Sequence, residues 1–117
     1  MPNVKDKTDY AGVFGHAACA VYANLSYGNI IYQVHQKGGQ WLGETKNREK
    51  YAGVYNKPID GLCMKIDVPG KKVYYRAHLK TKNKWLPWVT GYNVKDDNNG
   101  YAGILGQEID AIQVYVK

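Results

Sequence analysis

A short motif that occurs three times constrains the fold of this chain more than any other feature. Tyr-Ala-Gly followed by Val or Ile stands at residues 10–13, 51–54 and 101–104. The second and third copies continue alike, with Ile-Asp opening an apolar pattern at residues 59–66 and 109–116. Self-similarity of this kind predicts a fold of repeated units, because one such unit cannot bury its apolar face alone. We call these three segments, residues 10–25, 51–66 and 101–116, the tails.

The first tail differs from the others at one position. Residues 18–21, Ala-Cys-Ala-Val, fill the places of residues 59–62, so Cys19 stands where the other tails have Asp60 and Asp110. An Asp just before a strand typically caps a turn through a side-chain to backbone hydrogen bond, and we expect that role here. The other cysteine, Cys63, falls at a different place of its tail, so we expect two free thiols rather than a disulfide.

A second repeated block precedes the last two tails. It reads Tyr, any residue, Val or Ala, His, and later Trp-Leu, and it occupies residues 32–42 and 75–86. We call these blocks the heads. The chain therefore reads tail, head, tail, head, tail in a single domain, with units near residues 10–28, 29–67 and 71–117. The first tail lacks a head, so it either closes the structure against the last unit or belongs to a longer array.

Alternation of apolar and polar residues predicts strands in both blocks. It is found at residues 30–35 and 73–78 of the heads and at residues 61–66 and 111–116 of the tails. Gly, Pro and Asn clusters separate these segments, and no stretch shows a capped amphipathic helix. A chain of 117 residues is short for more than one domain. We therefore expect one all-β domain with internal pseudo-repeats, as a small barrel, a trefoil-like or prism-like arrangement, or a sandwich.

Composition narrows the function classes. The chain contains no apolar run near the ~18 residues that a membrane span requires, and its charged start lacks an apolar segment, so we expect neither a membrane span nor a signal peptide. The net charge of +6 favours an anionic partner. Eleven Tyr and three Trp against one Phe suit half-exposed surfaces that stack on sugars or bases.

The repeated histidines first suggest catalysis. His35 and His78 each precede a Trp and a tail Asp, which supplies two thirds of a nucleophilic triad. No Ser or Cys in a Gly-flanked turn accompanies them, and a small domain rarely duplicates its general base. The third histidine, His16, lies outside the head pattern, and no pair of ligands has metal-site spacing. We expect no catalytic residues, no bound metal and no cofactor.

Ligand binding and core packing both account for the repeated Trp and His. In the first interpretation, each Trp lies at the rim of a shallow groove, where the indole stacks on a sugar while His and a carboxylate hold hydroxyl groups. In the second, Trp41 and Trp85 anchor the core and the histidines bond a nearby turn. Trp88 has no counterpart in the first head, so we expect it to be exposed. The candidate ligand-binding residues are Trp88, His35, His78, Trp41, Trp85, Tyr92, Asp60 and Asp110.

The order of these motifs resembles a known family. Val-His at residues 34–35, Gly-Gly-Gln-Trp at 38–41 and Trp-Leu-Pro-Trp-Val-Thr-Gly at 85–91 are similar to the clostridial hydrophobic repeats with a central Gly-Trp. They also resemble modules that follow amidase or lysozyme domains in clostridial and phage cell-wall lytic enzymes. The resemblance covers residues 10–117, although Lys-Asn-Lys at 82–84 replaces the Gly-Gly-Gln of the first head.

This resemblance implies a non-catalytic module that anchors a lytic enzyme to the Gram-positive cell wall. The expected partners are a wall glycan or a teichoic-type polymer, and a catalytic domain attached in a longer parent chain. The expected location is extracellular and wall-associated, with phage release at lysis as one route. Two alternatives remain: a free-standing lectin-like or protein-interaction domain, and, less favoured, a single-stranded nucleic-acid binder. The last has little support, because the only arginines are Arg48 and Arg76.

Overall fold

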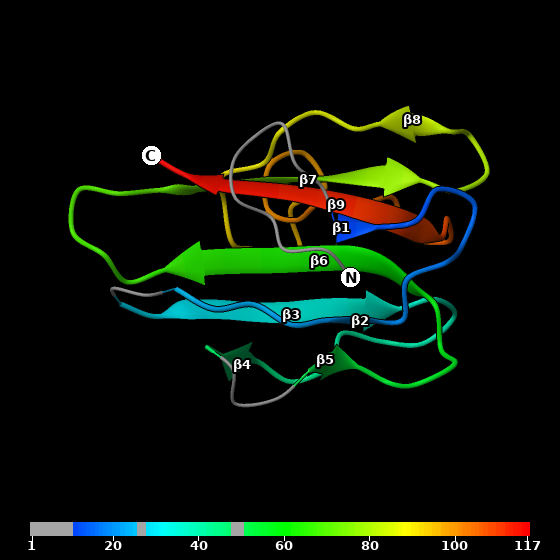
Figure 1. Cartoon of the computed structure of the whole chain (residues 1–117), viewed down its shortest axis with the longest axis horizontal. Coiled ribbons are helices and arrows are strands. Elements are labelled where there is room, and N and C mark those ends of the chain that lie inside the picture. The colour runs from blue at the N-terminus through cyan, green and yellow to red at the C-terminus, as the bar shows by residue number, and fades with distance from the viewer. Residues whose placement is uncertain (1–10, 26–27, 48–50) are drawn as a thin grey trace.

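The computed structural model describes residues 11–25, 28–47 and 51–117, so Tyr10, Arg48 and Lys50 lie outside the described residues. The described part contains nine strands and no helix, which confirms the predicted all-β class (Figure 1). No helix there is long and apolar enough to cross a membrane. The strands are β1 (Ala11–Gly12), β2 (Ala20–Val21), β3 (Ile30–Gln36), β4 (Thr45–Lys46), β5 (Ala52–Gly53), β6 (Ile59–Ile66), β7 (Val73–Leu79), β8 (Lys84–Trp85) and β9 (Ile109–Val116).

The strands form three antiparallel sheets, and each sheet contains the main strand of one tail, β9, β6 or β2. Their orders are β1-β9-β7-β8, β4-β3-β6 and β2-β5. In the first two sheets a head strand pairs with the tail that follows it, β7 with β9 and β3 with β6. In the first tail, which has no head, β2 forms the short β2-β5 sheet, and β1 joins the sheet of β9. The repeat found in the sequence is therefore a repeat of sheets.

The two complete units have the same register. His35 faces Gly61 across the β3-β6 pair, and His78 faces Ala111 across the β7-β9 pair. Each ladder is then interrupted by a bulge at the next residue, Gln36 or Leu79. This agreement confirms the predicted equivalence of residues 30–35 with 73–78 and of 61–66 with 111–116, although both tail strands begin two residues earlier than predicted.

Each Tyr-Ala-Gly motif pairs with a tail strand of a different unit. β1 pairs with β9, β5 pairs with β2, and Ala102 forms a bridge with Leu62 of β6. The β1-β9 pair closes the first unit against the last one. The three motif glycines explain the close approach: they have φ of 118°, 127° and 119°, and a Cβ on any of them would lie 2.2 or 2.3 Å from a carbonyl oxygen of the facing strand. Only glycine fits this position without moving the backbone.

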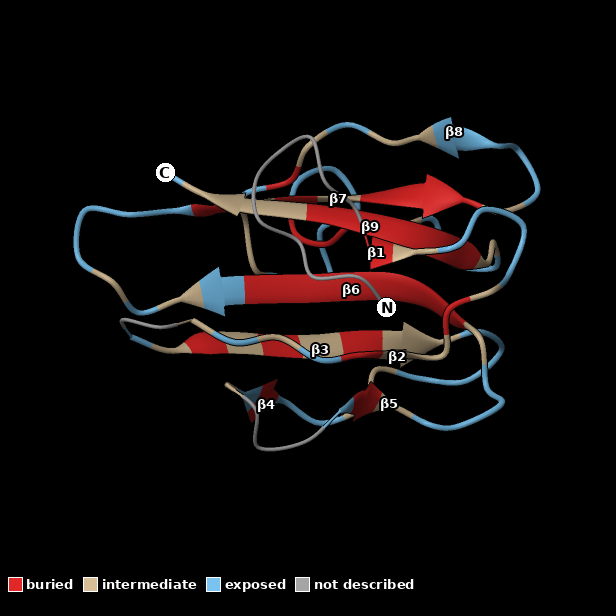
Figure 2. Ribbon diagram, in the orientation of Figure 1, coloured by how far each residue is buried: buried red, intermediate tan, exposed pale blue. Residues whose placement is uncertain are grey.

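The core lies where the three tails meet. Ala18, Ile59 and Ile109 occupy the same place in their tails, and the Ala18 N–H donates to the Ile109 carbonyl while the Ile59 N–H donates to the Ala18 carbonyl. Tyr32 and Tyr75, the equivalent tyrosines of the two heads, are fully buried. Burial is continuous along most of β6 and the first half of β9 (Figure 2). The tail strands therefore start together at one end of the molecule.

Candidate functional site

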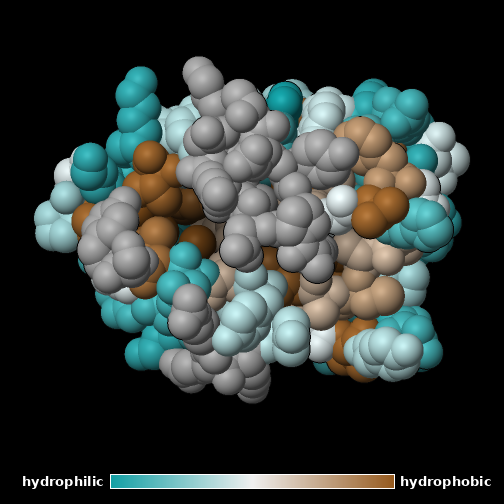
Figure 3. Space-filling model, viewed as in Figure 1, coloured by the Kyte–Doolittle hydropathy of each residue, from teal (hydrophilic) through white to brown (hydrophobic). Residues whose placement is uncertain are grey.

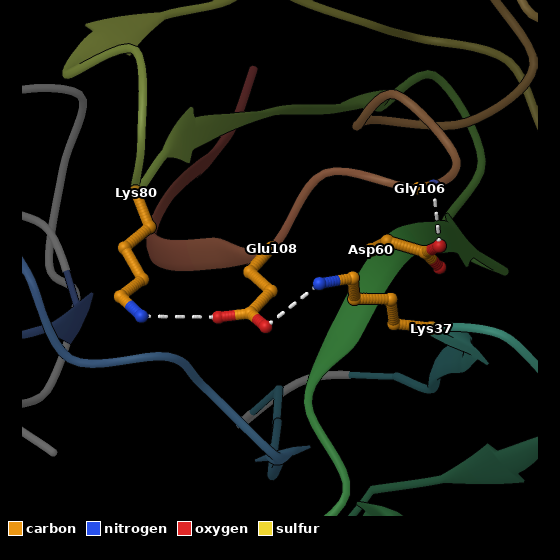
Figure 4. A network of polar contacts seen from close by, with 5 residues as sticks. All are labelled: Lys37, Asp60, Lys80, Gly106 and Glu108. Carbon is orange, nitrogen blue, oxygen red and sulfur yellow. Dashed lines mark hydrogen bonds and ion pairs between the residues drawn. The ribbon is translucent and has the colours of Figure 1, made fainter.

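The second tail carries a buried carboxylate that joins two units. The Nδ1 of His35 donates to Asp60 Oδ1 over 2.6 Å, since a carboxylate only accepts. The other oxygen of Asp60 accepts the backbone N–H of Gly106 over 2.7 Å (Figure 4). We call this arrangement of His, Asp and turn N–H a clasp. It confirms that Asp60 caps a turn, but the turn belongs to the following unit rather than to its own tail.

The third tail repeats the clasp. His78 Nδ1 donates to Asp110 Oδ1 over 2.6 Å, and the backbone N–H of Gly15 donates to Asp110 Oδ2 over 2.8 Å. Both aspartates are almost fully buried. A buried carboxylate that accepts from two donors holds the turn of one unit against the strand of another.

Aromatic and apolar side chains surround the clasp histidines. Phe14, from the turn that supplies Gly15, stacks on the His78 ring with centroids 4.3 Å apart, and Trp85 contacts the same ring edge-on at 5.1 Å. In the other clasp, Trp41 contacts His35 edge-on at 5.3 Å. Leu105 takes the place of Phe14 there, since its side chain and the Trp41 ring both lie over Gly61.

These contacts correct part of the expectation for the histidines and tryptophans. The histidines do lie on the outer face of their strands, but His78 is only 3% exposed because Phe14 covers it. Trp41 and Trp85 are half-buried, so they are neither core anchors nor free rim residues. Each instead packs in a group with the clasp histidine and the apolar turn residue.

At the headless first tail this arrangement is incomplete. Cys19 replaces the carboxylate, and Asn56, with φ of 65°, stands where the other two turns have glycine. Tyr51 is 66% exposed, whereas the equivalent Tyr101 is 7% exposed and packs edge-on against Trp41. Tyr55, the counterpart of Phe14 and Leu105, is 86% exposed.

The three turns that follow the Tyr-Ala-Gly motifs gather exposed apolar residues at one end of the molecule. They lie at that end because the N–H groups of Gly15 and Gly106 donate to aspartates near the start of β9 and β6. These two strands begin together near Ala18. Figure 3 shows brown and tan side chains over the right-hand part of this view, where those strands begin. The large apolar residues exposed on the turns are Val13, Phe14, Val54, Tyr55, Ile104 and Leu105.

Lysines of both heads reach the same end. Lys37 and Lys80, at equivalent places after β3 and β7, donate to the two oxygens of Glu108 over 2.9 and 3.2 Å (Figure 4). These hydrogen bonds lower the pKa of Glu108. The two lysines are therefore ion-paired, so they are not an open cationic patch.

Trp88 does not have the exposure expected for it. It is half-buried, because the Tyr115 ring contacts it edge-on at 4.9 Å and the Arg76 guanidinium lies over it at 4.6 Å. Arg76 lies on β7 and Trp88 lies in the segment after β8, so their contact depends on the fold and not on local sequence.

Tyr92 lies apart from both clasps. Its hydroxyl accepts from the Gln33 amide over 3.0 Å and donates to the Glu44 carboxylate. Burial and the neighbouring carboxylate raise the pKa of Tyr92. Tyr92 therefore ties its loop to the second unit, and its hydroxyl is already engaged.

Both cysteines are free, as predicted. Cys63 is fully buried, its thiol donates to the Gly100 carbonyl, and burial raises its pKa to about 11. Cys19 is half-buried at the headless position. Among the described residues, no three His, Cys, Asp or Glu side chains are grouped as metal ligands.

Four turn residues at the clasps were not predicted as site residues: Phe14, Gly15, Leu105 and Gly106. The sequence does carry a signal for the turns, because a bulky residue followed by Gly or Asn succeeds each motif, in Phe14-Gly15, Tyr55-Asn56 and Leu105-Gly106.

Comparisons with protein-family models, curated proteins and solved structures return no match for this chain. The function of the site is therefore inferred from its geometry.

Proposed function

We propose that the chain is a non-catalytic binding module that holds a lytic enzyme on the Gram-positive cell wall by recognising a wall glycan or an anionic wall polymer. The observation that supports this most is the set of three equivalent turns at one end, with Phe14, Tyr55 and Leu105 exposed by 45%, 86% and 42%. Two of these side chains lie beside a clasp: Phe14 stacks on the His78 ring, and Leu105 lies with the Trp41 ring over Gly61.

The chemistry of these places suits sugars. Aromatic and aliphatic faces pack on the apolar side of a pyranose, and half-buried polar groups beside them orient its hydroxyls. One such contact is weak. Repetition compensates, because a polymer already bound at one turn meets the next at high effective concentration.

A protein partner is the second candidate, because exposed apolar clusters also mark protein interfaces. Tyr55 favours it most, since it is 86% exposed with Val54 beside it. A free-standing lectin-like domain would use the same surface.

Sedimentation with purified clostridial cell walls, before and after teichoic acid extraction, tests the proposal. The triple variant Phe14→Ser, Tyr55→Ser, Leu105→Ser should lose most of its sedimentation. A control variant, Lys71→Ala, changes an exposed residue between β6 and β7, away from the turns (Figure 1), and should sediment like the wild type. Equal sedimentation of the folded triple variant would refute the proposal.

Salt separates the ligand classes. Binding to a polyanion should weaken steeply between low and high ionic strength, whereas stacking on a neutral glycan should hardly change. Wall binding that survives teichoic acid extraction and salt would indicate the glycan.

A further inference from the structure

Arg76 lies on the outer face of β7 against two indole rings. Its guanidinium carbon is 4.9 Å from the ring centroid of Trp85 and 4.6 Å from that of Trp88. Its Nε donates to the side-chain oxygen of Gln113 over 2.6 Å, which fixes the plane of the guanidinium. Arg76 is thus held in one orientation by three neighbours.

Toward the described residues, most of the N–H donors of Arg76 make no hydrogen bond. A guanidinium has five N–H groups and no acceptor, and the Gln113 bond uses only the one on Nε. Among the residues that the structure describes, no carboxylate pairs with Arg76 and nothing accepts from its two terminal nitrogens. The neighbouring rings also remove water from the group, which lowers the pKa of Arg76, although an arginine stays charged at any physiological pH.

On the equivalent face of the second unit, the cation already has a carboxylate partner. There Gln33 takes the place of Arg76, and the nearby cation is Lys65, which lies over the Tyr92 ring at 4.5 Å. Lys65 has a carboxylate of its own, Glu44, at 3.8 Å. Within the described residues, the Arg76 face has the cation and the aromatic rings but no carboxylate paired with the cation.

We infer that Arg76, with Trp85 and Trp88, binds an oxyanion carried on a sugar or polyol chain. The two rings contact the guanidinium, while its terminal N–H groups match the paired oxygens of a phosphate or a carboxylate. The aromatic surface continues beyond Trp88 to Tyr115 and then Tyr74, whose rings stack 4.7 Å apart and nearly parallel. The chain that carries the oxyanion packs along these rings.

This inference rests on the proposed function and specifies its ligand: an anionic component of the wall polymer. It concerns the face of the β7-β9 pair, whereas the proposed glycan contacts are the apolar turns at the end of the molecule. The two are tested with different variants and different ligands.

The test is an NMR titration of the ¹⁵N-labelled chain. The probes are glycerol 3-phosphate, glucuronate and, as the uncharged arm, methyl glucoside, and the signals are the Arg76 Nε–H and the tryptophan indole N–H groups. Both anions, or one of them, should shift the Arg76, Trp85 and Trp88 signals, while methyl glucoside at the same concentration should leave Arg76 unmoved. A response to glycerol 3-phosphate alone identifies a phosphate ligand, and a response to glucuronate alone identifies a carboxylate.

Three variants complete the experiment. Arg76→Gln should weaken anion binding about tenfold or more, because it removes a charge-assisted hydrogen-bond donor. Arg76→Lys keeps the charge without the planar fork and should bind with intermediate affinity. The matched control Lys65→Gln removes the cation that Glu44 already pairs, and should bind like the wild type. A well-dispersed spectrum verifies that each variant is folded.

Two results would overturn the inference: no anion-dependent shift at Arg76 in the wild type, or unchanged anion affinity in folded Arg76→Gln. If wall sedimentation persists in either case, only the oxyanion site fails and the proposed function stands. If instead the Arg76 site binds the anions but the wild type does not sediment with walls, the proposed function fails and the site belongs to another anionic partner.

Discussion

Replacing Asp110 by Ala removes the one acceptor that His78 Nδ1–H and the Gly15 N–H share. A buried donor left without a partner costs about 1–3 kcal/mol. The His78 bond is buried and the Gly15 bond partly buried, so the two losses together predict about 2–5 kcal/mol. A domain of this size has a free energy of unfolding of about 5–15 kcal/mol, so the variant should lose a large share of it.

Asp110→Asn divides the effect. Its amide oxygen still accepts from His78, but its NH₂ group then faces the Gly15 N–H, so we expect a loss of about 1–3 kcal/mol. The chain supplies a control in Cys19, which fills the same place in the tail that has no head to supply a histidine. Cys19→Ala should cost about 1 kcal/mol or less.

Urea unfolding followed by far-UV circular dichroism measures all three variants. A double-mutant cycle with His78→Ala isolates the His78–Asp110 interaction, for which we expect a coupling of about 1.5–3 kcal/mol. The reasoning is refuted if Asp110→Ala costs no more than Cys19→Ala.

Other predictions concern the backbone, the ion pairs and the thiols. Gly103→Ala places a Cβ 2.3 Å from the Asp60 carbonyl oxygen at a φ of 119°, so it should lower the free energy of unfolding by about 2–4 kcal/mol. The control Gly38→Ala has open space around the new Cβ and should cost about 1 kcal/mol. Similar thermal midpoints for the two variants would contradict this prediction. The lowered pKa of Glu108 favours its charged form in the folded state, so its contribution is present above the ordinary value of 4.5 and is lost as the pH falls through the folded pKa. Glu108→Gln should therefore show a smaller drop in thermal midpoint than the wild type between pH 5 and pH 3, and parallel curves would exclude the ion-pair contribution. Because burial raises the pKa of Cys63 to about 11, iodoacetamide at pH 8 should alkylate Cys63 more slowly than Cys19. Mass spectrometry of the peptides would measure both rates, and equal rates would show that burial does not protect Cys63.

Alternation in the sequence was sufficient to predict the long strands and their equivalence. Both the β3-β6 and the β7-β9 pairs follow from a period of two in short segments, which is a local property. The clasps were predicted only in part: the sequence identified His35 and Asp60 as a recurring combination. It gave no means of locating the Gly106 donor, 46 residues from Asp60, because the turn and the tail belong to different units.

Exposure was the hardest property to predict. The lack of a counterpart suggested that Trp88 was free, yet Arg76 and Tyr115 cover it through contacts that exist only after β7 and β9 pair. Tyr51 and Tyr101 occupy the same place in identical motifs, yet Tyr51 is 66% exposed and Tyr101 is 7% exposed. The reason is that Tyr101 packs against the head tryptophan Trp41. A residue's surroundings in a repeat protein depend on the neighbouring unit as well as on its own motif.

The exchange of segments between units also governs how the chain folds. Residues 11–12 pair with 111–112, and the Gly15 N–H reaches Asp110 across 95 residues, so the first unit completes its contacts only when the last strand is present. Such non-local pairing predicts a high contact order and slow folding, on the millisecond to second scale of all-β domains. On the ribosome, β1 has no strand to pair with until β9 has emerged, so the nascent chain cannot reach its native state one unit at a time.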